Sequence, residues 1–364
     1  MCRVAGKVLY EYGLMHTVPV QIFSMHDAAA DADENKYFPA EMFTGYNASK
    51  AKFIADAVAA GSKCKTVILS HINLVMAGWL IKKISPATEI ILMAHGIEIW
   101  YPLSKRKTMM LKACDRIMAV SSYTCERITK RYEEAGKKCI VLNNCIDPFL
   151  KRPGIKKRDE GLMKRYGFNA EDIILFTLTR LSAKDRYKGY DHVLHAIASL
   201  SAENANLKYL LAGSCDPEEK KYILGITERL GLQDKVVLAG FVPDNELPAH
   251  FALADVYVMP SIKEGFGIVF VEAMFYGLPV IAGNADGSSD ALLKGRLGLL
   301  IEPEKPEEIA DAIMKILNEP DKYKPDNTLL MEHFSYECYK RKLGGVLFNE
   351  SHCEPELAEG GFDS

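Results

Sequence analysis

Short runs of β-branched residues alternate with helical patterns along most of the chain, and this alternation limits the fold more than any other feature. Helical segments such as 48–61 separate these runs. Strands that alternate with helices form a parallel sheet covered on both faces. The expected strands are VPVQIF (18–23), KTVILS (65–70), TEIILMA (88–94), RIMAVS (116–121), KCIVLN (138–143), DIILFTL (172–178), LKYLLAG (207–213), KVVLAG (235–240), DVYVMP (255–260), LPVIAG (278–283) and LGLLI (297–301).

The series of strands pauses at a charged segment that contains Pro148, Pro153 and Gly154. A chain of 364 residues is also too long for one ordinary core. The sequence therefore predicts an α/β fold of two tandem Rossmann-like doubly wound domains that face a central cleft. The expected bounds are a first domain at 1–150, a linker at 151–165, a second domain at 166–334, a helix at 335–350 that returns to the first domain, and an acidic tail at 351–364.

Composition indicates a soluble protein of a reducing compartment. Hydrophobic residues make up 48% of the chain and charged residues 26%, and no apolar run is long enough to cross a membrane. The N-terminus lacks the basic-then-apolar pattern of a signal peptide. The nine cysteines are odd in number and form no C-x-x-C pair, so we expect reduced thiols and a cytoplasmic location. Cys114 and Cys139 lie in apolar company and are predicted core residues.

The net charge of −3 conceals a basic first half and an acidic second half. The first 160 residues carry 24 Lys and Arg against 16 Asp and Glu, and the rest carry 21 against 32. The basic clusters 105–107 and 130–131 have two interpretations. They form a solvated surface, or they contact the inner face of an anionic membrane peripherally. Because no nucleic-acid-reading motif accompanies these clusters, we expect no nucleic-acid partner.

Two carboxylates lie in the otherwise apolar stretch 261–283. Glu264 and Glu272 flank Gly265, Gly267 and several large apolar residues, and carboxylates are rarely buried without a partner or ligand. The glycines place Glu264 on a loop before a helix at about 267–276. In a continuous helix the two residues would be about 12 Å apart along the axis, which favours one long ligand over one shared atom. A helix start also attracts phosphate. The alternative is a capped helix with one surface and one ion-paired glutamate.

Other polar residues follow predicted strands and would face the cleft. Arg180 and Lys188 are suited to bind a diphosphate, although a surface salt-bridge network that includes Lys184, Asp185 and Arg186 explains these charges equally well. His95 follows the strand at 88–94 and has a side chain that can transfer a proton or hold a sugar hydroxyl. A structural role is the alternative for His95, and equally for three further polar residues, His71, Asn144 and Asp147.

Several cofactor motifs are missing from the sequence. It contains no G-x-G-x-x-G or P-loop sequence and no spaced zinc ligands. Its D-x-D pattern, Asp31 to Asp33, lies in a polar loop rather than after a strand. We therefore expect no metal site and no required cofactor, with cationic side chains neutralising any diphosphate.

Together these motifs resemble the GT-B-fold retaining glycosyltransferases of family four, the glycosyl transferases group 1. The resemblance covers roughly residues 1–350, and its most specific part is the order and spacing of the R…K-G and E-x7-E segments. The matching segments are Arg180 to Gly189, Glu264 to Glu272, HGIEIW from His95, SSYT at 121–124, NNCID at 143–147 and AGF at 239–241.

The resemblance implies a role for each site residue. Arg180 and Lys188 would bind the diphosphate of the donor, Glu272 the ribose hydroxyls and Glu264 the donor sugar. His95 would approach the sugar from the first domain. Backbone groups would cradle sugar and phosphate, and two residues would border the base; these are Gly265, Phe266, Gly267 and Ile268 for the cradle, and Gly240 and Phe241 for the base.

The expected activity is transfer of a sugar from a UDP-, GDP- or ADP-sugar to a glycan or lipid-linked acceptor, in polysaccharide or glycoconjugate synthesis. Without a dependable carboxylate nucleophile, front-face attack is favoured, with a phosphate oxygen taking the proton of the acceptor. One departure is that the segment from Met1 reads as the first helix, so the family's first strand and glycine-rich loop are expected to be missing. This departure motivates the alternative of a nucleotide-sugar-binding protein with impaired catalysis. A retaining glycoside hydrolase is disfavoured, since its carboxyls must lie about 5 Å apart.

Overall fold

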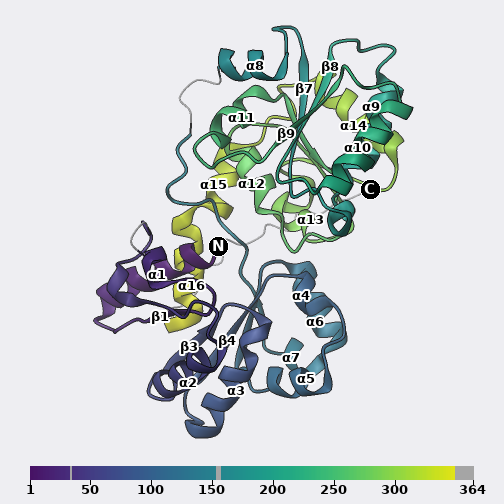
Figure 1. The fold of residues 1–364 in the computed structure, drawn as a ribbon. Helices are drawn as coiled ribbons and strands as arrows, with labels where there is room; N and C mark the ends of the chain where they lie inside the picture. The colour runs from purple at the N-terminus through teal and green to yellow at the C-terminus, as the bar shows by residue number, and fades with distance from the viewer. Residues whose placement is uncertain (33–34, 153–156, 349–364) are drawn as a thin grey trace, which may run out of the picture.

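The chain forms two α/β lobes, each built on a parallel sheet (Figure 1). The computed structural model describes residues 1–32, 35–152 and 157–348. Asp33 of the D-x-D pattern, Pro153, Gly154 and the predicted acidic tail lie outside the described residues. The predicted fold class is confirmed.

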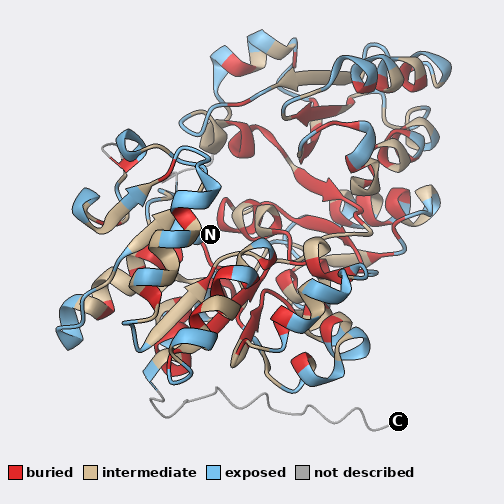
Figure 2. Cartoon of the chain, turned by 60° about the horizontal axis from the view of Figure 1, so that its bottom comes forward, coloured by how far each residue is buried: buried red, intermediate tan, exposed pale blue. Residues whose placement is uncertain are grey.

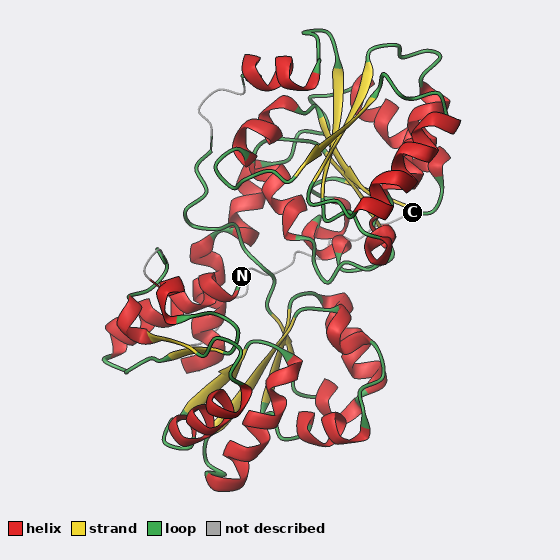
Figure 3. Cartoon of the chain, in the orientation of Figure 1, coloured by secondary structure: helices red, strands yellow, loops and turns green. Residues whose placement is uncertain are grey.

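The first lobe has a four-stranded parallel sheet in the order β3-β4-β5-β6, flanked by helices (Figure 3). Its strands are β3 (Thr66–Leu69), β4 (Glu89–Ala94), β5 (Arg116–Ala119) and β6 (Cys139–Val141). Its helices are α1 (Cys2–His16), α2 (Lys50–Gly61), α3 (Val75–Ile84), α4 (Ile97–Trp100), α5 (Lys105–Leu111), α6 (Ser122–Arg131) and α7 (Glu133–Gly136).

The prediction of a strand at 18–23 is largely wrong. The strand there is β1 (Ile22–Ser24), which pairs only with β2 (Phe43–Gly45) in a separate two-stranded parallel sheet. The Val18 backbone carbonyl and the Val20 side chain instead lie against Gly13 of α1, where the missing side chain leaves room for them. The segment after Met1 is helix α1, as predicted.

The second lobe has a six-stranded parallel sheet in the order β12-β11-β10-β7-β8-β9. All six predicted strand segments are confirmed, as β7 (Ile173–Leu178), β8 (Leu207–Ala212), β9 (Val236–Gly240), β10 (Val256–Met259), β11 (Val280–Gly283) and β12 (Leu299–Ile301). The helices that follow the first lobe are α8 (Glu160–Tyr166), α9 (Tyr190–Leu200), α10 (Pro217–Arg229), α11 (Leu247–Leu253), α12 (Ile268–Phe275), α13 (Ser288–Ala291), α14 (Pro306–Asn318), α15 (Asn327–Phe334) and α16 (Tyr336–Phe348).

The central strands are buried on both faces, which explains their uninterrupted apolar sequences (Figure 2). Cys114 is buried in the core of the first lobe, and Cys139 packs partly buried against it. Helix α8 occupies most of the second half of the expected linker. Helix α16 packs against α1 and the first sheet, with Tyr339, Leu343 and Val346 in the same cluster as Val8. Helix α16 thus contributes to the core of the first lobe.

Candidate active site

The loop that carries Glu264, residues 260–267, lies between β10 and α12, as predicted. It is the glutamate loop. Gly267 is the N-cap of α12 with a φ of 79°, a conformation that favours glycine, and Gly277, with a φ of 81°, follows the helix. Glu264 precedes the helix on the loop, and Glu272 lies within it. No hydrogen bond among the described residues joins their two carboxyl groups.

Glu264 faces Lys188 across the loop. Their side chains are only 14% and 16% exposed and form an ion pair, so Glu264 is the ion-paired glutamate of the alternative interpretation. Lys188 comes from a 3₁₀ turn, Ala183–Lys188, that ends at Gly189. A Cβ atom on Gly189 would lie 2.4 Å from the Pro260 carbonyl oxygen, so only glycine lets this turn approach the end of β10. The pairing keeps a cation at the start of the glutamate loop.

Glu272 has a different environment, because its carboxylate accepts no hydrogen bond from the described residues. It is half-buried in α12 among buried apolar neighbours. Burial, with a smaller effect from Asp147, raises the pKa of Glu272 to about 7. A half-buried acid without a protein partner is an acceptor available to a ligand.

The backbone N–H groups of residues 265–268 are also without acceptors among the described residues. They precede or begin α12, where the helix dipole favours an anion. The adjoining carbonyls are taken: the Ser121 hydroxyl donates to the Gly265 carbonyl oxygen at 2.6 Å, and the Gly287 N–H donates to the Glu264 carbonyl oxygen at 2.9 Å. The loop therefore presents the N–H groups of residues 265–268 as donors, while the carbonyl oxygens of Glu264 and Gly265 already accept hydrogen bonds.

Arg180 follows β7 and is held by one carboxylate. Its guanidinium donates to Asp185 at 2.6 and 3.1 Å, and Asp185 also accepts from the Ser182 hydroxyl. The arginine side chain is 71% exposed and Asp185 is buried. The local salt-bridge interpretation is thus correct for Arg180, and the pairing also fixes the direction of an exposed cation.

The base-side candidates lie at the end of β9. Gly240 ends that strand with a φ of 72°, and the side chain of Phe241 is 72% exposed. An aromatic ring so exposed next to a strand end is a surface on which a planar base can stack.

His95 reaches the same region from the first lobe. Its Nε2 lies 2.8 Å from the Ser70 carbonyl oxygen, and its ring also hydrogen-bonds the Cys2 thiol, which raises the pKa of His95 against the opposing effect of burial. The peptide after β4 touches the glutamate loop: a Cβ atom on Gly265 would lie 1.8 Å from the His95 carbonyl oxygen. The structure therefore places the His95 backbone against Gly265 where the lobes meet, whereas the His95 ring bonds to Ser70 of its own lobe.

Two aspartates that the sequence did not single out bond to this region, Asp290 across the lobes and Asp286 within the second lobe. Asp290 of α13 accepts from the Ser122 hydroxyl at 2.6 Å and from the Tyr123 N–H at 3.4 Å, at the N-terminus of α6. Asp286, after β11, accepts from the Glu264 N–H at 2.5 Å. The signal available for both was their position after a strand of a parallel sheet, where polar residues face the cleft.

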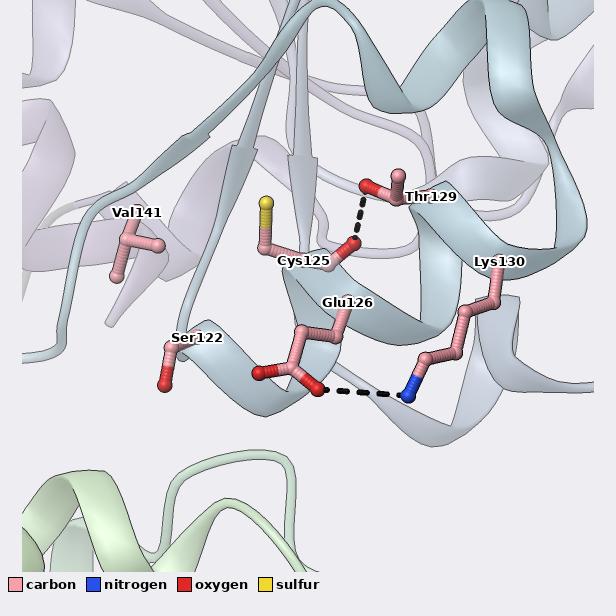
Figure 4. Close-up of a pocket in the computed structure, with 6 residues that line it drawn as sticks. All are labelled: Ser122, Cys125, Glu126, Thr129, Lys130 and Val141. Carbon is pink, nitrogen blue, oxygen red and sulfur yellow. Dashed lines mark hydrogen bonds and ion pairs between the residues drawn. The ribbon is translucent and has the colours of Figure 1, made fainter.

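A hollow on α6 borders this region through Ser122 (Figure 4). None of the predicted site residues lines it. Its lining residues are Ser122, Cys125, Glu126, Thr129, Lys130 and Val141. The chemistry of the backbone donors and free carboxylate, rather than the depth of a hollow, identifies the candidate site.

Comparison with known proteins decides the family. The family described as glycosyl transferases group 1 matches residues 159–327. These residues belong to the glycosyl transferases group 1. The predicted family is therefore confirmed for this part of the chain.

Curated relatives of this chain include sugar-transferring enzymes. A GDP-mannose-dependent alpha-(1-6)-phosphatidylinositol monomannoside mannosyltransferase from Mycobacterium tuberculosis is 30% identical over 251 residues, which are 66% of this chain and 63% of that protein. Mannosylfructose-phosphate synthase from Agrobacterium fabrum is 25% identical over 270 residues, 71% of this chain and 58% of the relative. The chain thus spans less than two thirds of the length of these relatives.

Solved structures show the same fold over nearly the whole chain. HepE from Anabaena, in complex with UDP and glucose, has a TM-score of 0.75 at 18% identity and covers 94% of this chain and 95% of its own. A glycosyltransferase from Rickettsia africae has a TM-score of 0.76 at 18% identity, covering 96% and 95%. The two lobes form the GT-B fold.

Proposed function

We propose that the protein is a retaining glycosyltransferase that moves a sugar from a nucleoside-diphosphate sugar to a glycan or lipid-linked acceptor, in polysaccharide or glycoconjugate synthesis. One observation carries the proposal: backbone N–H groups without acceptors among the described residues lie at the start of α12, next to the loop glutamate that pairs with Lys188. Farther along the same helix, the Glu272 carboxyl has no hydrogen-bond partner among the described residues. An anion fits the N–H groups, and a hydroxyl-bearing group fits the carboxylate. A nucleoside diphosphate carries both.

The proposed roles follow from this arrangement. Lys188, Arg180 and the N–H groups of residues 265–268 bind the diphosphate, and Glu272 accepts from the ribose hydroxyls. As the glycosidic bond breaks, the leaving diphosphate gains negative charge, which fixed donors stabilise more in the transition state than in the ground state. We propose that Lys188 and Arg180 neutralise the charge of the diphosphate without a metal. Phe241 and Gly240 border the base.

The sugar would lie between Glu264 and His95; the backbone of Gly265, the residue after Glu264, is in contact with the His95 backbone. Lys188 pairs with Glu264 in this structure. Donor binding would give Lys188 a second anionic partner, the diphosphate. Front-face attack, with a diphosphate oxygen accepting the proton of the acceptor hydroxyl, needs no carboxylate nucleophile. This suits a site in which Glu264 is already paired.

The test is calorimetry with UDP, GDP and ADP, followed by nucleotide release from the matching sugar donors with a panel of glycan and lipid-linked acceptors. GDP is the first probe because curated relatives use GDP-mannose, and UDP is the second because UDP is bound in HepE. We expect one nucleotide to bind at least tenfold more tightly than the others. Binding without release would select the alternative, a nucleotide-sugar-binding protein. No binding to any of the three would contradict the function.

Peripheral membrane contact is a further part of this proposal. Met109 and Ile84 are 47% and 64% exposed, and Met109, Lys83 and Lys112 line one hollow between α3 and α5. Apolar side chains among lysines suit an anionic bilayer surface. No helix among the described residues is long and apolar enough to span a membrane.

We expect sedimentation with phosphatidylglycerol vesicles, and loss of most binding in the double variant Lys83→Glu, Lys112→Glu. Added salt should weaken binding as well, since the contact is between charges. The matched control is Lys220→Glu with Lys221→Glu on α10 of the other lobe, which should sediment like the wild-type protein. Equal sedimentation with neutral phosphatidylcholine vesicles would contradict an electrostatic contact.

A further inference from the structure

Asp286 lies behind the glutamate loop and is almost completely buried, with 1% of its surface exposed. One carboxylate oxygen accepts from the Glu264 N–H at 2.5 Å, and the other accepts from the Ser288 N–H at 2.9 Å. It therefore joins the segment after β11 to the residue that faces Lys188.

The neighbouring backbone reinforces this junction. The Gly287 N–H donates to the Glu264 carbonyl oxygen at 2.9 Å, so both backbone polar groups of Glu264 are bound by residues 286 and 287. A Cβ atom on Gly287 would lie 2.2 Å from the Gly265 carbonyl oxygen. The two loops pack backbone against backbone, which leaves little freedom for the peptide at Glu264.

Burial of a carboxylate at this position disfavours its ionised form. Burial raises the pKa of Asp286 to about 6, although the N–H groups of Ser288 and Glu264 oppose the rise. Its oxygens accept from both N–H groups, whereas an asparagine in the same place offers only one acceptor oxygen and turns an N–H₂ toward the other N–H. Asparagine therefore removes one of the two bonds and keeps the size.

We propose that Asp286 is a positioning residue for the donor sugar. By binding the Glu264 N–H, it directs the Glu264 side chain toward Lys188. This role rests on the proposed function, and Asp286 acts through Glu264 rather than by touching the donor.

The test is a double-mutant cycle of Asp286→Asn and Glu264→Gln, measured as turnover of the intact donor and as affinity for the free nucleoside diphosphate. We expect Asp286→Asn to lower kcat about 10- to 100-fold, the range that follows from misplacing a site group by about 1 Å. Affinity for the free diphosphate should change less than about threefold. In the Glu264→Gln background, the same substitution should cost less than about threefold, because its effect passes through Glu264.

Asp172→Asn is the matched control. Asp172 is also buried, 5% exposed, and caps the Asn169 N–H at 2.7 Å in the same lobe. We expect both variants to lose thermal stability, and only Asp286→Asn to lose kcat. Additive losses in the cycle, or equal losses of kcat in the two variants, would overturn the proposal.

Hydrogen exchange supplies a readout that needs no substrate. Asp286→Asn should speed amide exchange in peptides covering residues 261–268, whereas Asp172→Asn should not. Unchanged exchange there would overturn the positioning role. If the wild-type protein binds no nucleotide, the proposed function fails and the donor role of Asp286 fails with it. If the wild-type protein turns over donor and Asp286→Asn does so equally well, only the positioning role fails.

Discussion

Substitution of Gly265 by alanine is expected to abolish most sugar transfer without unfolding either lobe. A Cβ atom at this position would lie 1.8 Å from the His95 carbonyl oxygen and 3.3 Å from the Gly96 Cα. Both are backbone atoms of the other lobe, so no side chain can rotate away. The lobes must separate, which breaks the 2.6 Å bond from the Ser121 hydroxyl to the Gly265 carbonyl oxygen.

We expect a loss of about 100-fold or more in kcat, because reacting groups held by two lobes lose their alignment when the lobes part. Turnover of the donor measures this, and small-angle scattering should show a larger radius of gyration. The control is Gly225→Ala in α10, where the new Cβ would meet only the Arg229 guanidinium, at 4.0 Å. This control should raise stability by about 1 kcal/mol and leave kcat unchanged. Normal turnover in Gly265→Ala would show that the contact between His95 and Gly265 is not needed for transfer.

Much of the fold was predictable because parallel strands buried on both faces have continuous apolar sequences. The six strands of the second lobe were found this way, and Gly267 and Gly277 marked the ends of α12. The strand at 18–23 failed for a related reason. The Val20 side chain packs against Gly13 and Val18 is 48% exposed, and short apolar runs do not distinguish packing against a helix from pairing in a sheet.

The sequence predicted where the candidate residues lie along the strands and loops, but it did not predict their partners. The loop position of Glu264 followed from its glycines, yet its pairing with Lys188 joins residues 76 positions apart. The same holds for Asp286 with Glu264, and for Ser121 with Gly265 across 144 positions. Local pattern limits which side chains face the cleft, whereas tertiary packing decides which of them meet.

Replacement of Glu272 by glutamine is expected to weaken nucleotide binding and stabilise the free protein, two opposite effects from one carboxyl group. An ionised acceptor of ribose hydroxyls contributes about 1.5–3 kcal/mol, so affinity for the nucleoside diphosphate should fall roughly 10- to 100-fold. Calorimetry at pH 8 measures this loss. Affinity of the wild-type protein should also fall as the pH drops below about 7, because Glu272, with a pKa of about 7, then becomes protonated.

The stability effect has the reverse sign. Because the folded-state pKa of Glu272 lies above its ordinary value, the folded state retains a proton that the unfolded state has released between the two values. The free energy of unfolding of the wild-type protein therefore declines as the pH rises from about 4.5 through 7. Glutamine at position 272 does not ionise. Glu272→Gln should therefore unfold at higher temperature than the wild-type protein at pH 8 and at nearly the same temperature at pH 4.5.

Glu264→Gln is the matched comparison for nucleotide binding. Its carboxyl group is paired with Lys188 and is proposed to contact the sugar, so this variant should retain affinity for the free diphosphate and chiefly lose use of the intact donor. Equal losses of diphosphate affinity in the two variants would contradict the division of roles. A ribose contact by Glu272 is the feature that makes the same group costly in the free protein and favourable in the complex, since the hydroxyl groups of the ligand replace the water lost on burial.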